Sequence, residues 1–460
     1  MTPQAQPADA ARCMPRRIRW PRTLLGPPPG MKEVNLACWA LLAAMVFLKA
    51  GVPLWLKFKT GADSLNLLPA DFIYFYGIGT IANHYPLAQL YDYSLQLRTF
   101  NAIYALHDQA YGPSPYPPFV AIFFALFARL SFQRAFVLWG VFSLVMYLVG
   151  IVAAAREFFS GEPLKASLTV CLALSFYSFL IGTLANGQLT AVAVCAVGLA
   201  FVFDRHEKPV WSGLALSLLA YKPTLLLLIV PMMLVTRRFK TILGFLIGVV
   251  FLLATATALG GVAVWRAYLQ FITLFGKVAG LGDRSGLPLA KFVDLGSCLQ
   301  LAAGGRFAAG TVFSMLVAGA VFVALVILWW RSARSGKEAQ AMLWAATLTW
   351  TLLVSIYVPI YDSSLVALAM VWTIGSLAEW VWPSGVQWMV LLAVVTEVAS
   401  WFTTGFARQY HVQILSIAIF VLGVAQLAFL VRMVGGKRGE AAVRIPAAHP
   451  ADASLDSAID

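Results

Sequence analysis

The sequence predicts an all-α polytopic membrane protein. Its 460 residues are 60% hydrophobic and only 12% charged, whereas soluble domains are about 25% charged. Apolar stretches of about 18 or more residues recur along the chain, and each can cross a bilayer as a helix. Strands of a membrane barrel are shorter and alternate in polarity, so a barrel does not fit. We therefore expect about 12 membrane segments, within a range of about 10 to 13.

The positive charges predict the orientation of the chain. The net charge is +13, but the basic residues gather in short clusters at alternate membrane crossings. This is the positive-inside pattern of membrane proteins, so we expect contact with lipid headgroups and no nucleic-acid partner. The five cysteines match no zinc or redox motif, and no metal or other cofactor is expected. The clusters lie in residues 12–22, 237–240, 331–337 and 432–438.

The first quarter of the chain is expected to leave the cytoplasm and stay outside. Residues 1–33 form a basic cytoplasmic N-terminus, and the first span runs outward over about residues 34–56. Residues 57–116 then form an external segment. The apolar run over residues 117–130 is too short to span, so we expect it to be re-entrant or to lie at the interface.

The remaining spans follow from the same rule. Two spans after residue 130 bracket the turn at Asn186, and the apolar run 210–235 is broken at Lys222-Pro223. Because both flanks of that run are basic, we predict a bent hairpin with its apex at Lys222. A second external loop covers about residues 260–306. The transmembrane domain is expected to end at residue 433, before a disordered cytoplasmic tail over 434–460.

The external segment is rich in tyrosine. Eight of the fifteen tyrosines lie between residues 71 and 116. A tyrosine offers a flat apolar face and a hydroxyl, and a sugar ring uses both. Tyr74 and Tyr76 are therefore candidates for substrate binding, as is Tyr116, which Pro117 and Pro118 fix in an extended segment. The alternatives are an aromatic belt at the membrane interface and, for Tyr116, an ordinary helix start with proline in its first turn.

Asp71 opens this segment close to the apolar phase. An ionised carboxylate there is costly unless it is paired or used. As a functional residue it suits a general base, since carboxylates take protons from reacting hydroxyls. The alternative is a helix N-cap, for which aspartate is a preferred residue.

Four more polar residues interrupt the apolar spans. Asn186 and Gln188 supply amides at the outer end of a span, either for sugar or phosphate oxygens or for ordinary turn and cap chemistry. Lys222, near the hairpin apex, either neutralises a lipid phosphate or extends its amine to the interface. Asp362, next to Tyr361, is a second buried carboxylate or another cap. Predicted from charge alone, nearly all of these groups lie on the external side.

Taken together, these motifs resemble those of the bacterial polyprenyl-phosphate-dependent glycosyltransferases of family 87, membrane enzymes of the GT-C fold. The order and spacing of the motifs cover about residues 35–430. The later external loop near Lys291 and the residue at Ile360, often a histidine in the family, depart from its pattern. The matching motifs are Asp71-Phe-Ile-Tyr74, Leu90-Tyr91-Asp92, Tyr116-Pro-Pro-Phe119, Asn186-Gly-Gln188, Lys222-Pro223 and Tyr361-Asp-Ser-Ser-Leu365.

The resemblance implies a function and a place for each residue. A sugar, typically mannose, is transferred with inversion from a polyprenyl phosphate to a lipid or glycan acceptor, on the periplasmic or external face of the bacterial cytoplasmic membrane. Residues 34–433 are then the catalytic domain, and Asp71 is the general base. Lys222 counters the leaving phosphate. The remaining candidates hold the substrates: Tyr74, Tyr76, Tyr116, Asn186, Gln188, Tyr361 and Asp362.

Two other functions fit a membrane protein with polar groups on one face. A lipid or sugar carrier without chemistry needs access from both sides, so polar intramembrane residues are expected to face the cytoplasm too, and the sequence has few of them. A non-catalytic partner of another envelope enzyme retains the fold but not the reaction. Incorporation of a labelled sugar into lipid separates the enzyme from both.

Overall fold

The computed structural model describes residues 31–47, 71–104, 112–278, 288–304, 308–332, 336–379 and 383–435. Most of the predicted cytoplasmic N-terminus, the end of the first span, parts of both external loops and the predicted disordered tail lie outside these residues. Within them the chain is helical and has no β-strand, apart from an isolated antiparallel bridge between Phe292 and Pro359. The all-α prediction is confirmed.

The helices fall into a first and a second half of the chain. In the first half they are α1 (Met31–Val46), α3 (Phe72–His84), η2 (Leu87–Tyr91), α4 (Tyr93–Tyr104), α5 (Pro118–Phe127), α6 (Phe132–Phe159), α7 (Pro163–Ser175), η3 (Ser178–Ala185), α8 (Thr190–Arg205), α9 (Pro209–Ser217) and η4 (Leu218–Tyr221). In the second half they are η5 (Pro223–Leu226), α10 (Ile229–Val235), α11 (Phe239–Val278), η6 (Leu289–Lys291), α12 (Leu295–Ala302), α13 (Ala308–Ser332), α14 (Lys337–Val354), η7 (Ile360–Leu365), α15 (Val366–Glu379), α16 (Pro383–Tyr410) and α17 (Ile414–Val434).

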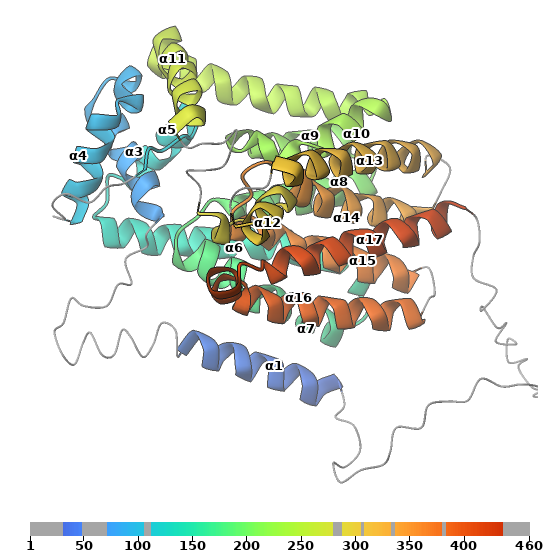
Figure 1. Ribbon diagram of the computed structural model, residues 1–460. Coiled ribbons are helices and arrows are strands. Elements are labelled where there is room, and N and C mark those ends of the chain that lie inside the picture. The colour runs from blue at the N-terminus through green and yellow to red at the C-terminus, as the bar shows by residue number, and fades with distance from the viewer. Residues whose placement is uncertain are drawn as a thin grey trace, which may run out of the picture.

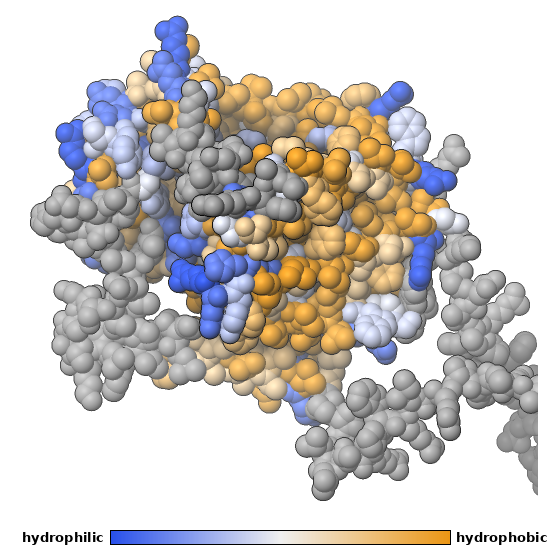
Figure 2. All heavy atoms as spheres, viewed as in Figure 1, coloured by the Kyte–Doolittle hydropathy of each residue, from blue (hydrophilic) through white to orange (hydrophobic). Residues whose placement is uncertain are grey.

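The long helices lie side by side in one bundle (Figure 1). α6 and α17 begin at one end of this bundle, which α3 and α4 extend on the left of Figure 1; we call it the site end. α1 begins and α17 ends at the opposite end, which we call the terminal end. An apolar band covers the flanks of the helices, and hydrophilic residues lie beyond it at both ends (Figure 2). This distribution is that of a multi-pass membrane protein.

The predicted count of about 12 membrane segments is not confirmed. Among the described residues, six helices are long and apolar enough to cross a membrane, or seven if α7 and η3, bent by 57°, form one broken span. The two arms of the hairpin, counted as segments, are shorter helices, and so is α5, which was expected to be too short to span. A helix rises about 1.5 Å per residue, so these pieces do not reach across a core about 30 Å thick.

Proline and glycine set several boundaries. α5, α7, α9 and η5 each carry a proline in their first turn, where the missing N–H costs nothing. The proline-start interpretation of Tyr116-Pro117-Pro118 is thereby confirmed. α11 bends at Gly261, whose φ of 63° suits glycine. α11 continues past this bend to Val278, so the predicted external loop over about residues 260–306 begins with helix.

The hairpin predicted at Lys222 is also present. Its two arms are α9–η4 and η5–α10, and the break falls at Lys222, where φ and ψ are −141° and 77°. At the apex the Tyr221 hydroxyl donates to the Leu189 carbonyl at the start of α8. The returning arm leads to Arg238, which pairs with Asp204 near the end of α8. The hairpin therefore runs from the terminal end to the site end and back.

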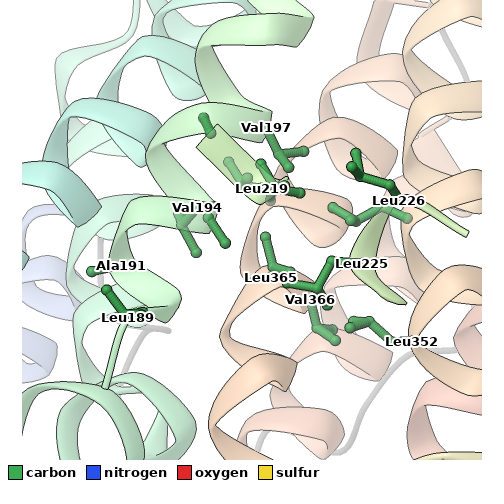
Figure 3. Close-up of a cluster of buried hydrophobic side chains, with 14 of the residues drawn as sticks. Leu189, Ala191, Val194, Val197, Leu219, Leu225, Leu226, Leu352, Leu365 and Val366 are labelled. Carbon is green, nitrogen blue, oxygen red and sulfur yellow. The ribbon is translucent and has the colours of Figure 1, made fainter. Parts of the chain in front are cut away.

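An apolar core packs against the apex of the hairpin at Lys222. Figure 3 shows side chains of α8, η4, η5, α14, η7 and α15 that point toward one another between the helices. Leu219, Leu225 and Leu365 are fully buried there. Burying a leucine stabilises the fold by about 1.5 to 3 kcal/mol. The helix ends that carry the candidate site residues therefore pack against a close-packed apolar core, which holds them in place.

Candidate active site

Asp71 occupies the N-cap position of α3 but does not cap it. Its side chain accepts no hydrogen bond from the backbone of the helix. The side-chain amide of Gln188 hydrogen-bonds to the Asp71 carboxylate instead. The N-cap interpretation of this residue is therefore wrong, and the carboxylate is left for another role.

A glycine turn brings Gln188 to this position. Gly187 has a φ of 74°, and a Cβ placed on it lies 2.7 Å from the Cβ of Phe72, the first residue of α3. Its carbonyl accepts a hydrogen bond from the buried Trp139 indole at 2.9 Å. Only glycine allows this approach, because a side chain is strained at that φ and collides with Phe72. The half-buried Asn186 belongs to the same turn.

Hydroxyl contacts join this turn to the start of α15. η3 packs against η7, where Ser178 and Ser363 share a hydrogen bond of 2.7 Å and Thr183 and Ser364 one of 3.2 Å. Gly182 of η3 leaves space for Tyr361, whose Cβ lies 3.1 Å from the position of an added Cβ. Residues 186–188 and 361–362 are thus brought together.

Lys222 and Asp362 form a buried ion pair. The lysine amine contacts Asp362 Oδ2, and the two side chains are only 11% and 1% exposed. Thr190 donates a hydrogen bond of 3.0 Å to the other carboxylate oxygen. The amine also lies over the rings of Tyr357 and Tyr361, 5.4 and 5.2 Å from their centroids. The interpretation that the Lys222 amine extends to the interface is wrong, since it turns inward to a partner.

Three tyrosines lie near both carboxylates. Tyr116, Tyr357 and Tyr361 are each within electrostatic range of both Asp71 and Asp362. A hydrogen bond joins the hydroxyls of Tyr116 and Tyr361. Burial raises the pKa of Tyr116 well above its ordinary value, and it raises the pKa of Tyr357 to about 12. These two hydroxyls are therefore neutral at pH 7 and can donate hydrogen bonds to sugar or phosphate oxygens.

Tyr74 and Tyr76 point in different directions. Residues that are two positions apart in a helix point about 200° away from each other, so Tyr74 and Tyr76 cannot share a face of α3. The Tyr74 ring packs edge-on against Phe100, with centroids 5.4 Å apart, and lies within electrostatic range of Tyr357. Tyr76 packs on Phe132 and donates a hydrogen bond of 2.8 Å to the Leu130 carbonyl. The structure brings Tyr74 toward the other candidates, whereas Tyr76 ties α3 to the turn before α6.

Two further residues of the site were not predicted. Lys291 is exposed, and its positive charge acts on Asp71. Tyr357 has a φ of 65°, a strained conformation for a bulky residue and one that is often found at functional sites. Only Lys291 had a weak signal in the sequence, because it lies in the loop that departs from the family pattern.

A capped helix holds this loop in place. Asp294 accepts the backbone N–H of Ser297 at 2.9 Å and so caps α12. It also accepts the Val358 N–H at 3.4 Å, and Val293 donates to the Val358 carbonyl at 2.9 Å. These bonds, together with the bridge between Phe292 and Pro359, hold Lys291 near Asp71 and Tyr357 near both carboxylates.

The environment of Asp71 sets its basicity. Burial raises the pKa of its carboxyl above the ordinary value, while the Gln188 hydrogen bond and the positive charge of Lys291 oppose that rise. The result is a carboxylate that is a stronger base than one in water. Among the described residues, no three His, Cys, Asp or Glu side chains gather as a metal site does.

The fold and the site together define a class of protein: a multi-pass membrane protein with a half-buried carboxylate, a buried ion pair and tyrosine hydroxyls collected at one end. Residues 115–356 match the model of glycosyltransferase family 87. Since this match covers more than half of the chain, the protein belongs to that family, a GT-C type family that depends on polyprenyl phosphate. Neither the curated proteins nor the solved structures gave a match.

The matched stretch contains only part of the site. Tyr116, the Asn186–Gln188 turn, Lys222 and Lys291 lie inside it, whereas Asp71 and Asp362 lie outside. The contacts of Asp71 with Gln188 and of Asp362 with Lys222 therefore connect the flanking segments to the part of the chain that carries the family signature.

Proposed function

We propose that the protein transfers a sugar, mannose in the first instance, from a polyprenyl-phosphate donor to a hydroxyl of a lipid or glycan acceptor. The observation that carries this proposal is the position of Asp71. Its half-buried carboxylate caps no helix and hydrogen-bonds to Gln188 within a polar cluster, and the chain belongs to a glycosyltransferase family. The site lies at the opposite end of the bundle from the basic residues Arg237 and Arg238. By the positive-inside rule that end faces the periplasm or exterior of a bacterial cytoplasmic membrane.

In the proposed reaction Asp71 is the general base. The acceptor oxygen attacks the anomeric carbon, and its proton passes to the Asp71 carboxylate. The bond between the anomeric carbon and the phosphate oxygen breaks on the opposite face, so the configuration inverts and polyprenyl phosphate leaves. Gln188 orients the carboxylate through its hydrogen bond. No metal takes part in this scheme.

The leaving phosphate needs a positive charge, and we assign that role to Lys291. Lys222 is less suited to it, because Asp362 already neutralises its charge inside the protein. Lys291 is exposed beside Asp71, and its charge is open to an incoming anion. The sugar is then held by a set of polar groups: the Lys222–Asp362 pair, Asn186, Tyr116 and the hydroxyl of Tyr361. Tyr74 lies at the edge of this set.

Replacing Lys291 with glutamine is expected to lower kcat/KM for the donor about tenfold to a hundredfold, the range for a lost hydrogen bond to a charged group. Lys291→Arg retains the charge and is expected to keep most of the activity. Removing the positive charge also raises the pKa of Asp71 further, so the acid limb of the pH profile moves to higher pH. An unchanged donor kcat/KM in the glutamine variant contradicts the assignment.

The function is tested by incubating the purified protein with radiolabelled polyprenyl-phosphate mannose and a membrane lipid extract. A labelled product that survives removal of the donor supports a glycosyltransferase, and a panel of donor lipids then identifies the sugar. A carrier is expected to move labelled donor across a vesicle membrane without forming a new glycosidic bond. Failure with every donor in the panel points to a non-catalytic partner.

A further inference from the structure

The terminal end of the bundle carries a polar hollow at the opposite end from the site described above. It lies where the end of α10 and the turn after it meet α13 and α14, and its volume is about 520 Å³. We call it the basic pocket. Its lining includes Thr236, Arg237, Arg238, Trp329, Trp330 and Gln340.

Part of this pocket is held rigidly by one carboxylate. Asp204 pairs with the Arg238 guanidinium and accepts hydrogen bonds from Gln340 at 2.7 Å and from the Trp344 indole at 2.9 Å. The Arg238 guanidinium also lies over the Trp329 ring, 4.9 Å from its centroid. Arg238 and Gln340 each keep further N–H groups beyond those given to Asp204. The pocket therefore presents fixed donors.

Arg237 adds a positive charge that no described carboxylate neutralises. It lies in the three-residue turn between α10 and α11, with a φ of 55°, and its side chain is exposed. The turn is closed by backbone bonds from Arg237 to Leu234 and from Arg238 to Met233. Since Asp204 balances only Arg238, the pocket has an excess positive charge and is suited to an anion.

An apolar stripe leads along α13 to the pocket. Val323, Ile327 and Trp330 are 55%, 49% and 63% exposed. Their spacing of four and three residues places them on one face of the helix. A tryptophan at the end of such a face is typical of the level of lipid headgroups. The stripe is where the hydrocarbon chains of a lipid lie if its headgroup enters the pocket.

We infer that the basic pocket binds the phosphate headgroup of an anionic phospholipid, whose chains follow the exposed face of α13. A free phosphate has the same charge chemistry as the headgroup but no hydrocarbon chains to pack on the stripe. The stripe therefore favours the lipid over free phosphate. The fixed guanidinium of Arg238 and the unpaired one of Arg237 contact the phosphate, and charge-assisted bonds of this kind are the stronger ones. The site is independent of the sugar-transfer chemistry proposed above.

The test measures lipid binding to the full-length protein in detergent by native mass spectrometry. The probes are phosphatidylglycerol, phosphatidylcholine and glycerol phosphate. Arg237→Asn removes the charge but keeps the turn, because asparagine tolerates a positive φ. Lys208→Asn, an exposed lysine at the same end of the bundle and outside the pocket, is the matched control.

We expect phosphatidylglycerol to bind more tightly than phosphatidylcholine, and Arg237→Asn to weaken it about fivefold to tenfold while Lys208→Asn does not. Trp330→Ala is expected to weaken the binding of phosphatidylglycerol and to leave the binding of glycerol phosphate unchanged. Equal losses in the Arg237 and Lys208 variants overturn the inference in favour of diffuse charge. Glycerol phosphate binding as tightly as the lipid, with no effect of Trp330→Ala, overturns it in favour of a free-phosphate site.

Discussion

Asp71→Asn is expected to lower kcat/KM for sugar transfer by about 100-fold to 10,000-fold, the contribution of a positioned general base. Asparagine has the same shape and can still accept a hydrogen bond from Gln188, but it takes up no proton. Folding should survive, because Asp71 caps no helix and its charge is costly where it lies. The measurement is initial transfer rate against donor concentration, with thermal unfolding in the same detergent.

Asp92→Asn is the matched control for this experiment. Asp92 lies in the same segment and is exposed, and it accepts the backbone N–H groups of Ser94 and Leu95 at 2.9 and 3.2 Å. It therefore acts as the helix cap that Asp71 is not. We expect its replacement to leave kcat/KM unchanged. Activity retained in the Asp71 variant, or lost equally in both, excludes Asp71 as the base.

The pH profile gives an independent check on the same residue. The protonated carboxyl cannot act as a base, so kcat/KM should fall as the pH falls through the pKa of Asp71. Since burial raises that pKa, the acid limb is expected above the ordinary value of about 3.9. The residual activity of Asp71→Asn should lack this limb.

The second large effect is expected at the Lys222–Asp362 pair. Removing either partner leaves the other charge buried alone, and this costs about 3 to 5 kcal/mol of folding free energy. Lys222→Met and Asp362→Asn should each unfold at a clearly lower temperature than wild type. The double variant should recover a large part of the loss, because neither charge then remains unpaired. The measurement is a double-mutant cycle by thermal or denaturant unfolding in detergent.

The exposed pair of Lys165 and Glu162 provides the comparison. Its side chains are 49% and 52% exposed, so Lys165→Met is expected to change stability by less than about 1 kcal/mol. If Lys222→Met costs no more than Lys165→Met, or if the double variant is as unstable as the sum of the singles, the pair is not coupled in the interior.

The sequence by itself determined the class of protein and several of its breaks. Apolar length and scarce charge require membrane helices, and the proline after Lys222 and the glycines at 260–261 end or bend them locally. Such features act within one or two helical turns, so they can be read from neighbouring residues. The motifs also indicated the family, which the match over residues 115–356 bears out.

Only the tertiary structure decided which polar residues meet. Asp71 faces Gln188, and Lys222 pairs with Asp362 across 140 residues of sequence. The cap of α12 by Asp294 and the bridge between Phe292 and Pro359 hold Lys291 near Asp71. Tyr76 instead donates its hydroxyl to the Leu130 carbonyl, away from the site. A residue type shows what chemistry is available, but its partner depends on how distant helices pack. That packing is set by many small apolar contacts spread over the chain, and no local pattern records them.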